Sequence, residues 1–178
     1  MRARPRSAAD FGPVALIDIT RVFAAEVVAG KYPYVEYDAE SRWHQRIYRD
    51  PRIDIWLISW LPTQATSLHD HGGSAGALTV VEGELIETVA AGDLGLGPSR
   101  PALELTRSAG ASVGFSRHYI HDVRNGAHQP AVSVHAYSPP LVSMTYYDLD
   151  AGELTPIATV ATDDPERELT AADLKAAS

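Results

Sequence analysis

Two histidines separated by one residue, His69 and His71 in the segment LHDHGG, are well placed for metal chemistry. Because side chains alternate between the two faces of a β-strand, a strand through this segment would place both imidazoles on one face. Neutral imidazole binds transition metals, so the pair forms half of a metal site. Such a pair also occurs as two polar residues at a strand end, and the prediction therefore requires a third ligand.

His121, in the strand-like segment HDVRN, supplies that ligand, with His118 as an alternative three residues earlier. The chain contains no cysteine, which excludes disulfides, thiolate ligands and a cysteine nucleophile. Three neutral histidines leave the charge of a divalent metal uncompensated and leave positions open for an anionic substrate and oxygen. This favours one iron(II) per chain, with zinc in a hydrolytic or isomerase site as the competing interpretation.

A second polar series, Ser133, His135 and Tyr137, lies in the segment SVHAYSPPL. On a strand these three side chains share one face, so a hydroxyl, an imidazole and a phenol can form a hydrogen-bonded chain. The alternative is a satisfied polar ladder beside the core. Trp56 and Trp60 also share a strand face, and we expect them in the core rather than under a substrate.

The elements that would carry these residues are mostly strands. Apolar positions at three- and four-residue spacing predict a helix over residues 14–29, ended by Gly30, within an N-terminal helical segment of about 10–30. From about residue 43 to 150, short Val-, Ile-, Tyr- and Trp-rich runs separated by Pro and Gly predict an all-β sandwich or closed barrel. The runs include IDIWLISW, GALTVVE, LIETVA, ASVGFS, AVSVHAYS and SMTYYDL. The polar tail, about 163–178, is expected to form a short surface helix or to fray, without a chemical role.

Composition narrows the class of protein. A chain of 178 residues fits a single domain, and its 45% hydrophobic and 21% charged residues are ordinary for a globular protein. A net charge of −8 without a basic cluster beyond the first residues disfavours nucleic acid as a partner. No apolar run is long enough to span a membrane, and no apolar region follows the arginines of the N-terminus as in a secretion signal. We therefore expect a cytoplasmic protein with a small-molecule partner, as a monomer or weak homo-oligomer.

The ordered motifs resemble two known families. HxH at His69 and His71, the glycines Gly76 and Gly83, and HxxxN from His121 to Asn125 resemble the two cupin motifs. His118 does not have that spacing. The further segment SVHAYSPPL is similar to cysteine dioxygenase, in which a Ser-His-Tyr series borders a three-histidine iron site. The resemblance extends over about residues 42–148.

The resemblance implies a cupin-type double-stranded β-helix (jelly-roll) barrel. It also implies an oxidoreductase in which Fe(II) on His69, His71 and His121 serves the addition of O2 to the sulfur of a small thiol, most simply L-cysteine to cysteine sulfinate. A dioxygenase for 3-mercaptopropionate or a related thiol is the near alternative. A cupin that binds metal for isomerisation, hydrolysis or ligand sensing is the more distant one.

The sequence departs from the family pattern in two places. In animal members a cysteine at the position matching Gly76 is crosslinked to the tyrosine, so the absence of cysteine here leaves Tyr137 a free phenol. The common cupin glutamate ligand is also missing, since Ala75 and Gly76 occupy its places.

The residue that meets the substrate carboxylate, an arginine on an early strand in the family, falls within WHQRIYRD. Strict alternation places Arg46 with His44 and Tyr48 on one face and Arg49 on the other. We therefore assign Arg46, whose guanidinium suits a bidentate contact with a carboxylate. A surface salt bridge is the alternative role for Arg46, and Gln45 in its place would favour 3-mercaptopropionate.

Overall fold

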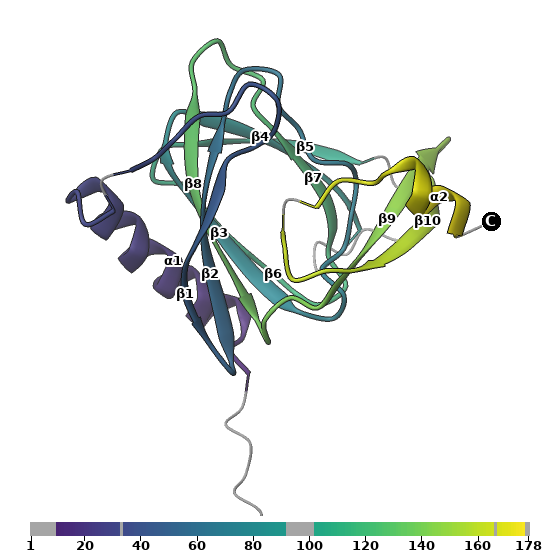
Figure 1. Ribbon diagram of the computed structural model, residues 1–178, viewed down its shortest axis with the longest axis horizontal. Coiled ribbons are helices and arrows are strands. Elements are labelled where there is room, and N and C mark those ends of the chain that lie inside the picture. The colour runs from purple at the N-terminus through teal and green to yellow at the C-terminus, as the bar shows by residue number, and fades with distance from the viewer. Residues whose placement is uncertain (1–9, 33, 92–101, 166, 177–178) are drawn as a thin grey trace, which may run out of the picture.

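The computed structural model describes residues 10–32, 34–91, 102–165 and 167–176, and its strands enclose a barrel (Figure 1). A five-stranded sheet with the order β1-β2-β8-β3-β6 forms one wall. The opposite wall contains the three-stranded sheet β5-β4-β7 and the hairpin β10-β9. The elements are α1 (Pro13–Val28), β1 (His44–Asp50), β2 (Ile53–Trp60), β3 (Ala75–Glu82), β4 (Glu84–Ala91), β5 (Leu103–Ser108), β6 (Ser112–Phe115), β7 (Ile120–Arg124), β8 (Ala131–Ser138), β9 (Ser143–Asp150), β10 (Glu153–Ala161) and α2 (Ala171–Ala176).

The five-stranded sheet is covered on both faces, and its sequence reflects this. β2 and β8 are buried along their whole length because one face lines the barrel interior and the other packs under α1. Trp56 and Trp60 point into the interior cluster, as expected for core residues, whereas Leu57 lies under the helix. Continuous apolar runs are typical of strands covered on both faces.

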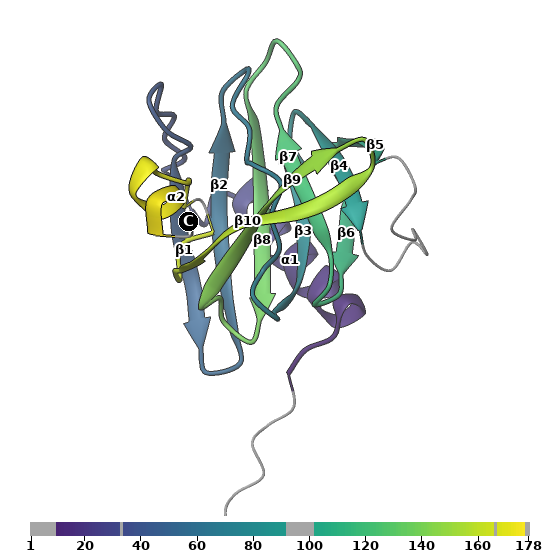
Figure 2. The same cartoon turned by 90° about the vertical axis from the view of Figure 1, so that its right-hand side faces the viewer.

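α1 lies across the outer face of this sheet, against β3, β8 and β6 (Figure 2). Pro13 begins the helix, where its missing N–H has no partner to lose. The chain leaves the helix through Gly30, whose φ of 77° lies in the left-handed region that glycine adopts without strain. The expected helix over 14–29 is therefore confirmed to within a residue at each end.

The six apolar runs correspond to β2, β3, β4, β6, β8 and β9. β5 and β10 were missed because their exposed positions carry charged and small residues that weaken the strand pattern. β10 also runs to Ala161, past the expected end of the barrel at about residue 150. The loop expected after β4 lies largely outside the described residues.

A β-bulge in β1 changes which of its side chains face the barrel. Arg46 pairs with Trp56 and Arg49 with Asp54, with the register shifting between Arg46 and Tyr48. Since Asp54 and Trp56 lie two residues apart on β2, Arg46 and Arg49 share the interior side, while Tyr48 packs on Phe23 of α1. The prediction from strict alternation was thus wrong for Arg49 and Tyr48, because one extra residue reverses the alternation.

The segment before β3 joins the two parts of the second wall. His69 forms single bridges to His121 of β7 and to Tyr146 of β9. His71 follows in a loop that turns at Gly72 and Gly73 into β3. The expectation of one regular strand carrying both histidines is therefore corrected, although both imidazoles still point inward.

The C-terminal segment returns across the barrel to β1 before α2 begins (Figure 1). α2 confirms the expected short helix, but residues before it, among them Asp163 and Leu169, contact the barrel rather than fray. Among the described residues, no helix is both long and apolar enough to cross a membrane.

Candidate metal centre

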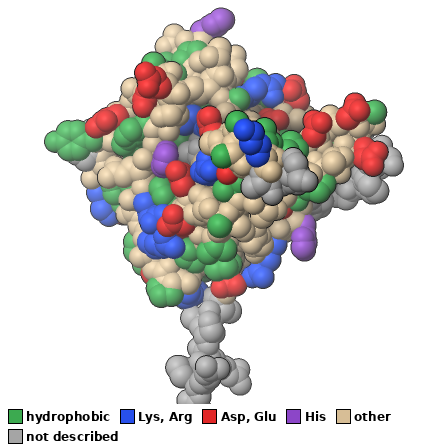
Figure 3. Space-filling view, turned by 45° about the vertical axis from the view of Figure 1, so that its right-hand side comes forward, with side chains coloured by type: hydrophobic (Ala, Val, Ile, Leu, Met, Phe, Trp, Pro, Cys, Tyr) green, Lys and Arg blue, Asp and Glu red, His purple; other side chains and the backbone are tan. Residues whose placement is uncertain are grey.

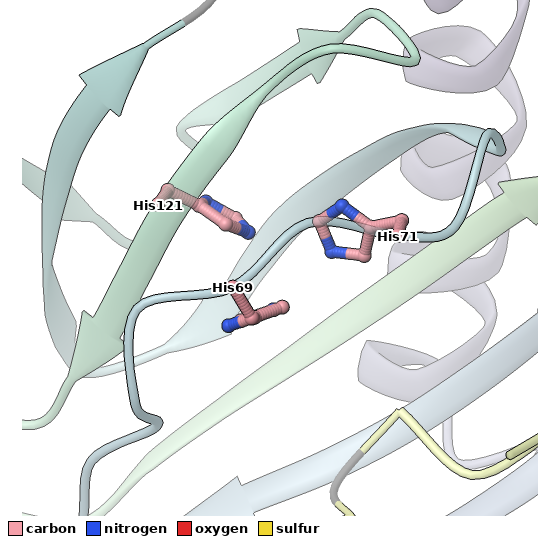
Figure 4. Close-up of side chains that lie close together, drawn as sticks. All are labelled: His69, His71 and His121. Carbon is pink, nitrogen blue, oxygen red and sulfur yellow. The ribbon is translucent and has the colours of Figure 1, made fainter. Parts of the chain in front are cut away.

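His69, His71 and His121 converge on one point inside the barrel (Figure 4). Each offers one ring nitrogen, and these three nitrogens lie within 4.8 Å of one another. All three side chains are buried. His118 is exposed and lies outside this cluster, so the alternative third ligand is excluded.

The hydrogen bonds of His69 and His121 leave the right atoms for a metal. Nδ1 of His69 donates to the carbonyl of Ser67 over 2.7 Å, and Nδ1 of His121 donates to Glu87 Oε1 over 2.9 Å. Each bond places the proton on Nδ1 and leaves the lone pair on Nε2. His71 is buried, and neither of its ring nitrogens has a hydrogen-bond partner in the part of the chain that the structure describes. A buried polar ring without a partner is unfavourable, and a metal ion on the shared point would satisfy it.

The protein environment keeps the rings of His69 and His71 neutral, as metal binding requires. Burial lowers the pKa of His69 to about 3, with a further contribution from His121. Burial also lowers the pKa of His71 well below its ordinary value, helped by the neighbouring His69. The lone pairs of both rings are therefore available at neutral pH.

Glu87 of β4 is the carboxylate of the site, although not in the usual cupin position. It is fully buried, and it accepts hydrogen bonds from His121, from Tyr119 Oη over 3.0 Å and from Arg107 Nη2 over 2.6 Å. Burial raises its pKa, but the bonds from His121 and Arg107 outweigh that effect and hold the pKa at about 2. Glu87 thus fixes the ring of His121 with a full negative charge. An acidic residue inside the apolar run LIETVA was the signal that could have identified it.

Ser133, His135 and Tyr137 form the expected chain on the interior face of β8. Ser133 Oγ lies 2.9 Å from His135 Nε2, and His135 Nδ1 lies 3.3 Å from Tyr137 Oη. Sequence reasoning missed that Trp60 Nε1 extends the chain by donating to Ser133 Oγ over 2.9 Å. At the other end the ring of Tyr137 stacks 5.1 Å from the ring of His71. The chain therefore ends beside the metal centre.

Phe115 fills the space beside Tyr137. Gly76 pairs with Tyr137 in the register of β3 and β8, which places the position expected to match the crosslinked cysteine directly opposite the phenol. A Cβ atom at Gly76 would lie 2.2 Å from Cε2 of Phe115. The Phe115 ring in turn stacks 4.7 Å from the ring of His71.

Arg46 lies on the barrel side of β1. It pairs with Trp56 of β2, which in turn pairs with His135 of β8. Its guanidinium carbon lies 4.4 Å from the centre of the Trp56 ring. Nη2 donates to the carboxylate and the backbone carbonyl of Asp163. Gln45 pairs with Leu57 and faces away from the barrel interior, which separates it from the site.

Arg42 was missed by sequence reasoning, because a single arginine before a strand carries no pattern. Its side chain is 4% exposed, lies over the Trp60 ring and forms an ion pair with Glu168 over 3.1 Å. Its charge contributes to the lowered pKa of His69, whose main cause is burial. His44 meets Asp164 instead, with Nε2 and Oδ1 3.1 Å apart.

A match to a protein-family model establishes the family of this chain. The family model of cysteine dioxygenase type I matches residues 15–150, which include the three histidines and the Ser133, His135 and Tyr137 series. This chain belongs to the cysteine dioxygenase type I family. Its fold is accordingly the cupin double-stranded β-helix with an N-terminal helix.

Named relatives agree with the family. The chain is 32% identical over 110 residues to cysteine dioxygenase type 1 of Danio rerio and 28% identical over 109 residues to that of Homo sapiens. Each match covers 57% of this chain and 52% of the relative, so the chain spans about half the length of these proteins. Among solved structures, TT1209 from Thermus thermophilus is similar with a TM-score of 0.50 and 25% identity, covering 59% of this chain and 90% of that one.

Proposed function

We propose that this protein is an iron(II)-dependent thiol dioxygenase that converts a small thiol to its sulfinate, RSH + O2 → RSO2H, with L-cysteine as the expected substrate. The observation that carries the proposal is the hydrogen-bonded chain that ends at Tyr137 beside three buried histidines. A dioxygenase for 3-mercaptopropionate is the near alternative. The expected compartment is the cytoplasm.

The three histidines would hold the metal through one ring nitrogen each, with Glu87 fixing the ring of His121. Iron(II), when bound, supplies coordination positions for a thiolate and for dioxygen and favours the deprotonated thiol. A site of this kind without a carboxylate ligand keeps a higher positive charge. That charge supports the binding of an anionic sulfur.

Tyr137 would donate a hydrogen bond to the oxygen or to the substrate. Trp60 can only donate, so Ser133 accepts from it and donates to His135 Nε2. Burial lowers the pKa of His135 to about 3, so the ring is neutral and carries its proton on Nδ1, facing Tyr137 Oη. The oxygen of Tyr137 then accepts from His135, which directs its own proton away from β8 and toward the site. The chain orients a proton donor rather than removing a proton.

Arg46 would bind the substrate carboxylate. Its place on the interior side, in register with Trp56 and His135, supports this role. The guanidinium also lies over an indole ring, which limits its conformations before substrate arrives.

The decisive experiment is oxygen uptake by protein loaded anaerobically with iron(II). Cysteine, 3-mercaptopropionate and cysteamine are offered separately, and the sulfinate product is quantified. We expect a carboxylate-bearing thiol to drive the fastest uptake, with oxygen uptake and sulfinate formation in a ratio of one to one. Bound iron without uptake for any thiol would refute the proposal and favour a metal-binding cupin of another activity.

A further inference from the structure

The C-terminal segment is anchored on the basic side chains around β1. Its acidic residues Asp163, Asp164 and Glu168 each meet a basic partner between residues 42 and 49. Leu169 packs against the cluster of Leu141, Met144 and Tyr146 and ties the same segment to the second wall. Acidic and basic side chains accordingly lie close together on the face seen in Figure 3.

Asp163 makes the shortest of these contacts. Its Oδ2 lies 2.7 Å from Nη2 of Arg46 and 2.7 Å from Nη1 of Arg49, and its backbone carbonyl accepts from Nη2 of Arg46 over 3.0 Å. The bulge in β1 makes this possible, because it places both arginines on the same side of the strand. The pKa of Asp163 is lowered by these hydrogen bonds from Arg49 and Arg46, so it stays charged.

The buried side of the Arg46 guanidinium has a different environment. Nη2 reaches out to Asp163, whereas Nε is buried and has no hydrogen-bond partner among the described residues. The Trp56 ring lies against the group, with the guanidinium carbon 4.4 Å from the ring centre. A buried N–H of a cation without an acceptor is unfavourable, so Nε is ready for an oxygen atom of a ligand. A carboxylate inside the barrel would supply one.

We propose that Asp163 is a positioning residue for substrate specificity: it clamps the outer edge of Arg46 and thereby presents Nε to the carboxylate of the thiol substrate. This inference rests on the proposed function. A free arginine side chain loses rotamer freedom when it binds a ligand, and Asp163 removes that freedom beforehand. The clamp therefore favours thiols that carry a carboxylate over thiols that do not.

The kinetic test uses Asp163→Asn in the iron-loaded full chain, with 3-mercaptopropionate and cysteamine as substrates. We expect the KM for 3-mercaptopropionate to rise roughly two- to tenfold, as expected for one side chain that must be ordered on binding, with kcat little changed. The kinetic constants for cysteamine, which has no carboxylate, should not change. Glu104→Gln, which removes an exposed ion pair with Arg124, is the matched control.

A binding test separates this inference from the proposed activity. Propionate is titrated into zinc-loaded protein while the side-chain Nε–H signals of 15N-labelled arginine are followed by NMR, with the Arg46 signal assigned from Arg46→Lys. We expect a saturable shift of that signal and a dissociation constant roughly two- to tenfold higher in Asp163→Asn.

The results that would overturn the positioning role of Asp163 differ from the result that would refute the proposed function. No shift at Arg46, an equal dissociation constant in Asp163→Asn, or an equal rise in KM for both thiols would overturn the positioning role. Absence of thiol turnover in the unaltered protein would instead refute the proposed function, while the propionate titration still decides the inference.

Discussion

At the scale of single residues, the site depends on partners that hold the ligands. His69 and His121 are each oriented through Nδ1, one by a carbonyl and one by Glu87. His71 has no such partner among the described residues and is held by ring contacts with Phe115 and Tyr137. The three ligands are thus positioned by three different means, which predicts different consequences for changes around each.

Glu87→Gln tests the first of these means. Glutamine keeps the shape of the side chain but removes the charge that orients His121, so we expect metal affinity to fall roughly 10- to 100-fold. Competition for zinc with a chromophoric chelator measures it. Glu84→Gln on the same strand, whose side chain accepts a hydrogen bond from the exposed Ser108, is the control. Equal affinities in the two variants would show that Glu87 serves packing alone.

Tyr137→Phe tests the hydrogen-bond donor proposed at the end of the chain. The phenylalanine ring keeps the stacking on His71 but has no hydroxyl, so we expect bound iron to remain while kcat falls roughly 10- to 100-fold, as for loss of a hydrogen bond to a charged group. Oxygen uptake and iron content are measured together. The exposed Tyr48→Phe provides the comparison. Unchanged turnover would make the chain a structural ladder.

At the scale of elements, the barrel shows where sequence patterns succeed. Runs such as IDIWLISW and AVSVHAYS correspond residue for residue to β2 and β8, because burial on both faces demands continuous apolar residues. The metal ligands were also predictable, since their spacing reflects the geometry of the fold. The roles of Ser133, His135, Tyr137 and Arg46 remain predictions, although their positions are as expected.

What the sequence could not indicate depends on contacts between distant segments. The bulge in β1 cannot be recognised in the sequence WHQRIYRD, yet it decides which way Arg49 faces. Glu87 looks like any acidic residue on a strand until β7 brings His121 against it. The tail from residue 163 is merely polar in sequence, and the basic partners that anchor it around β1 lie more than 100 residues away.

Gly76→Ala tests how closely β3 and β6 pack at the site. The new methyl group would lie 2.2 Å from Phe115 Cε2 and 3.1 Å from the carbonyl of Ala136, so the ring must move. We expect a loss of about 1–3 kcal/mol in the free energy of unfolding, as for overpacking in other cores, measured by denaturant titration. Phe115→Leu in the same chain should recover part of it. No loss in the single variant would contradict the packing described here.

At the scale of the whole molecule, the interior holds several groups whose pKa differs between the folded and the unfolded state. Burial lowers the pKa of His69 and His135 to about 3, and that of His71 well below its ordinary value. Burial raises the pKa of Asp54 to about 6, against smaller effects of Trp56, Arg49 and Arg46. These opposite shifts give opposite dependences of stability on pH.

The metal-free protein should lose stability as pH falls below about 6.5. In that range His69, His71 and His135 are protonated in the unfolded chain but not in the folded protein. Each of them lowers the free energy of unfolding by about 1.4 kcal/mol per pH unit. Asp54 binds a proton more readily in the folded state between about pH 4 and 6 and offsets one of the three. We therefore expect a net loss of roughly 4 kcal/mol between pH 7 and pH 5.

Denaturant unfolding of chelator-treated protein at both pH values measures this loss. His118→Ala, which removes an exposed histidine, should leave the difference unchanged. A free energy of unfolding that stays constant between the two pH values would show that the buried histidines titrate normally.

The phenylalanine ring beside Tyr137 also limits how this protein can evolve. A cysteine at Gly76 would face Tyr137 across the strands, but its Cβ would meet Phe115 first. A thioether link between positions 76 and 137 therefore requires two substitutions, and the first of them alone would disturb the contacts that hold His71. Selection would have to cross that less stable intermediate or begin by shrinking Phe115, so the order of mutations is constrained by the shape of one side chain.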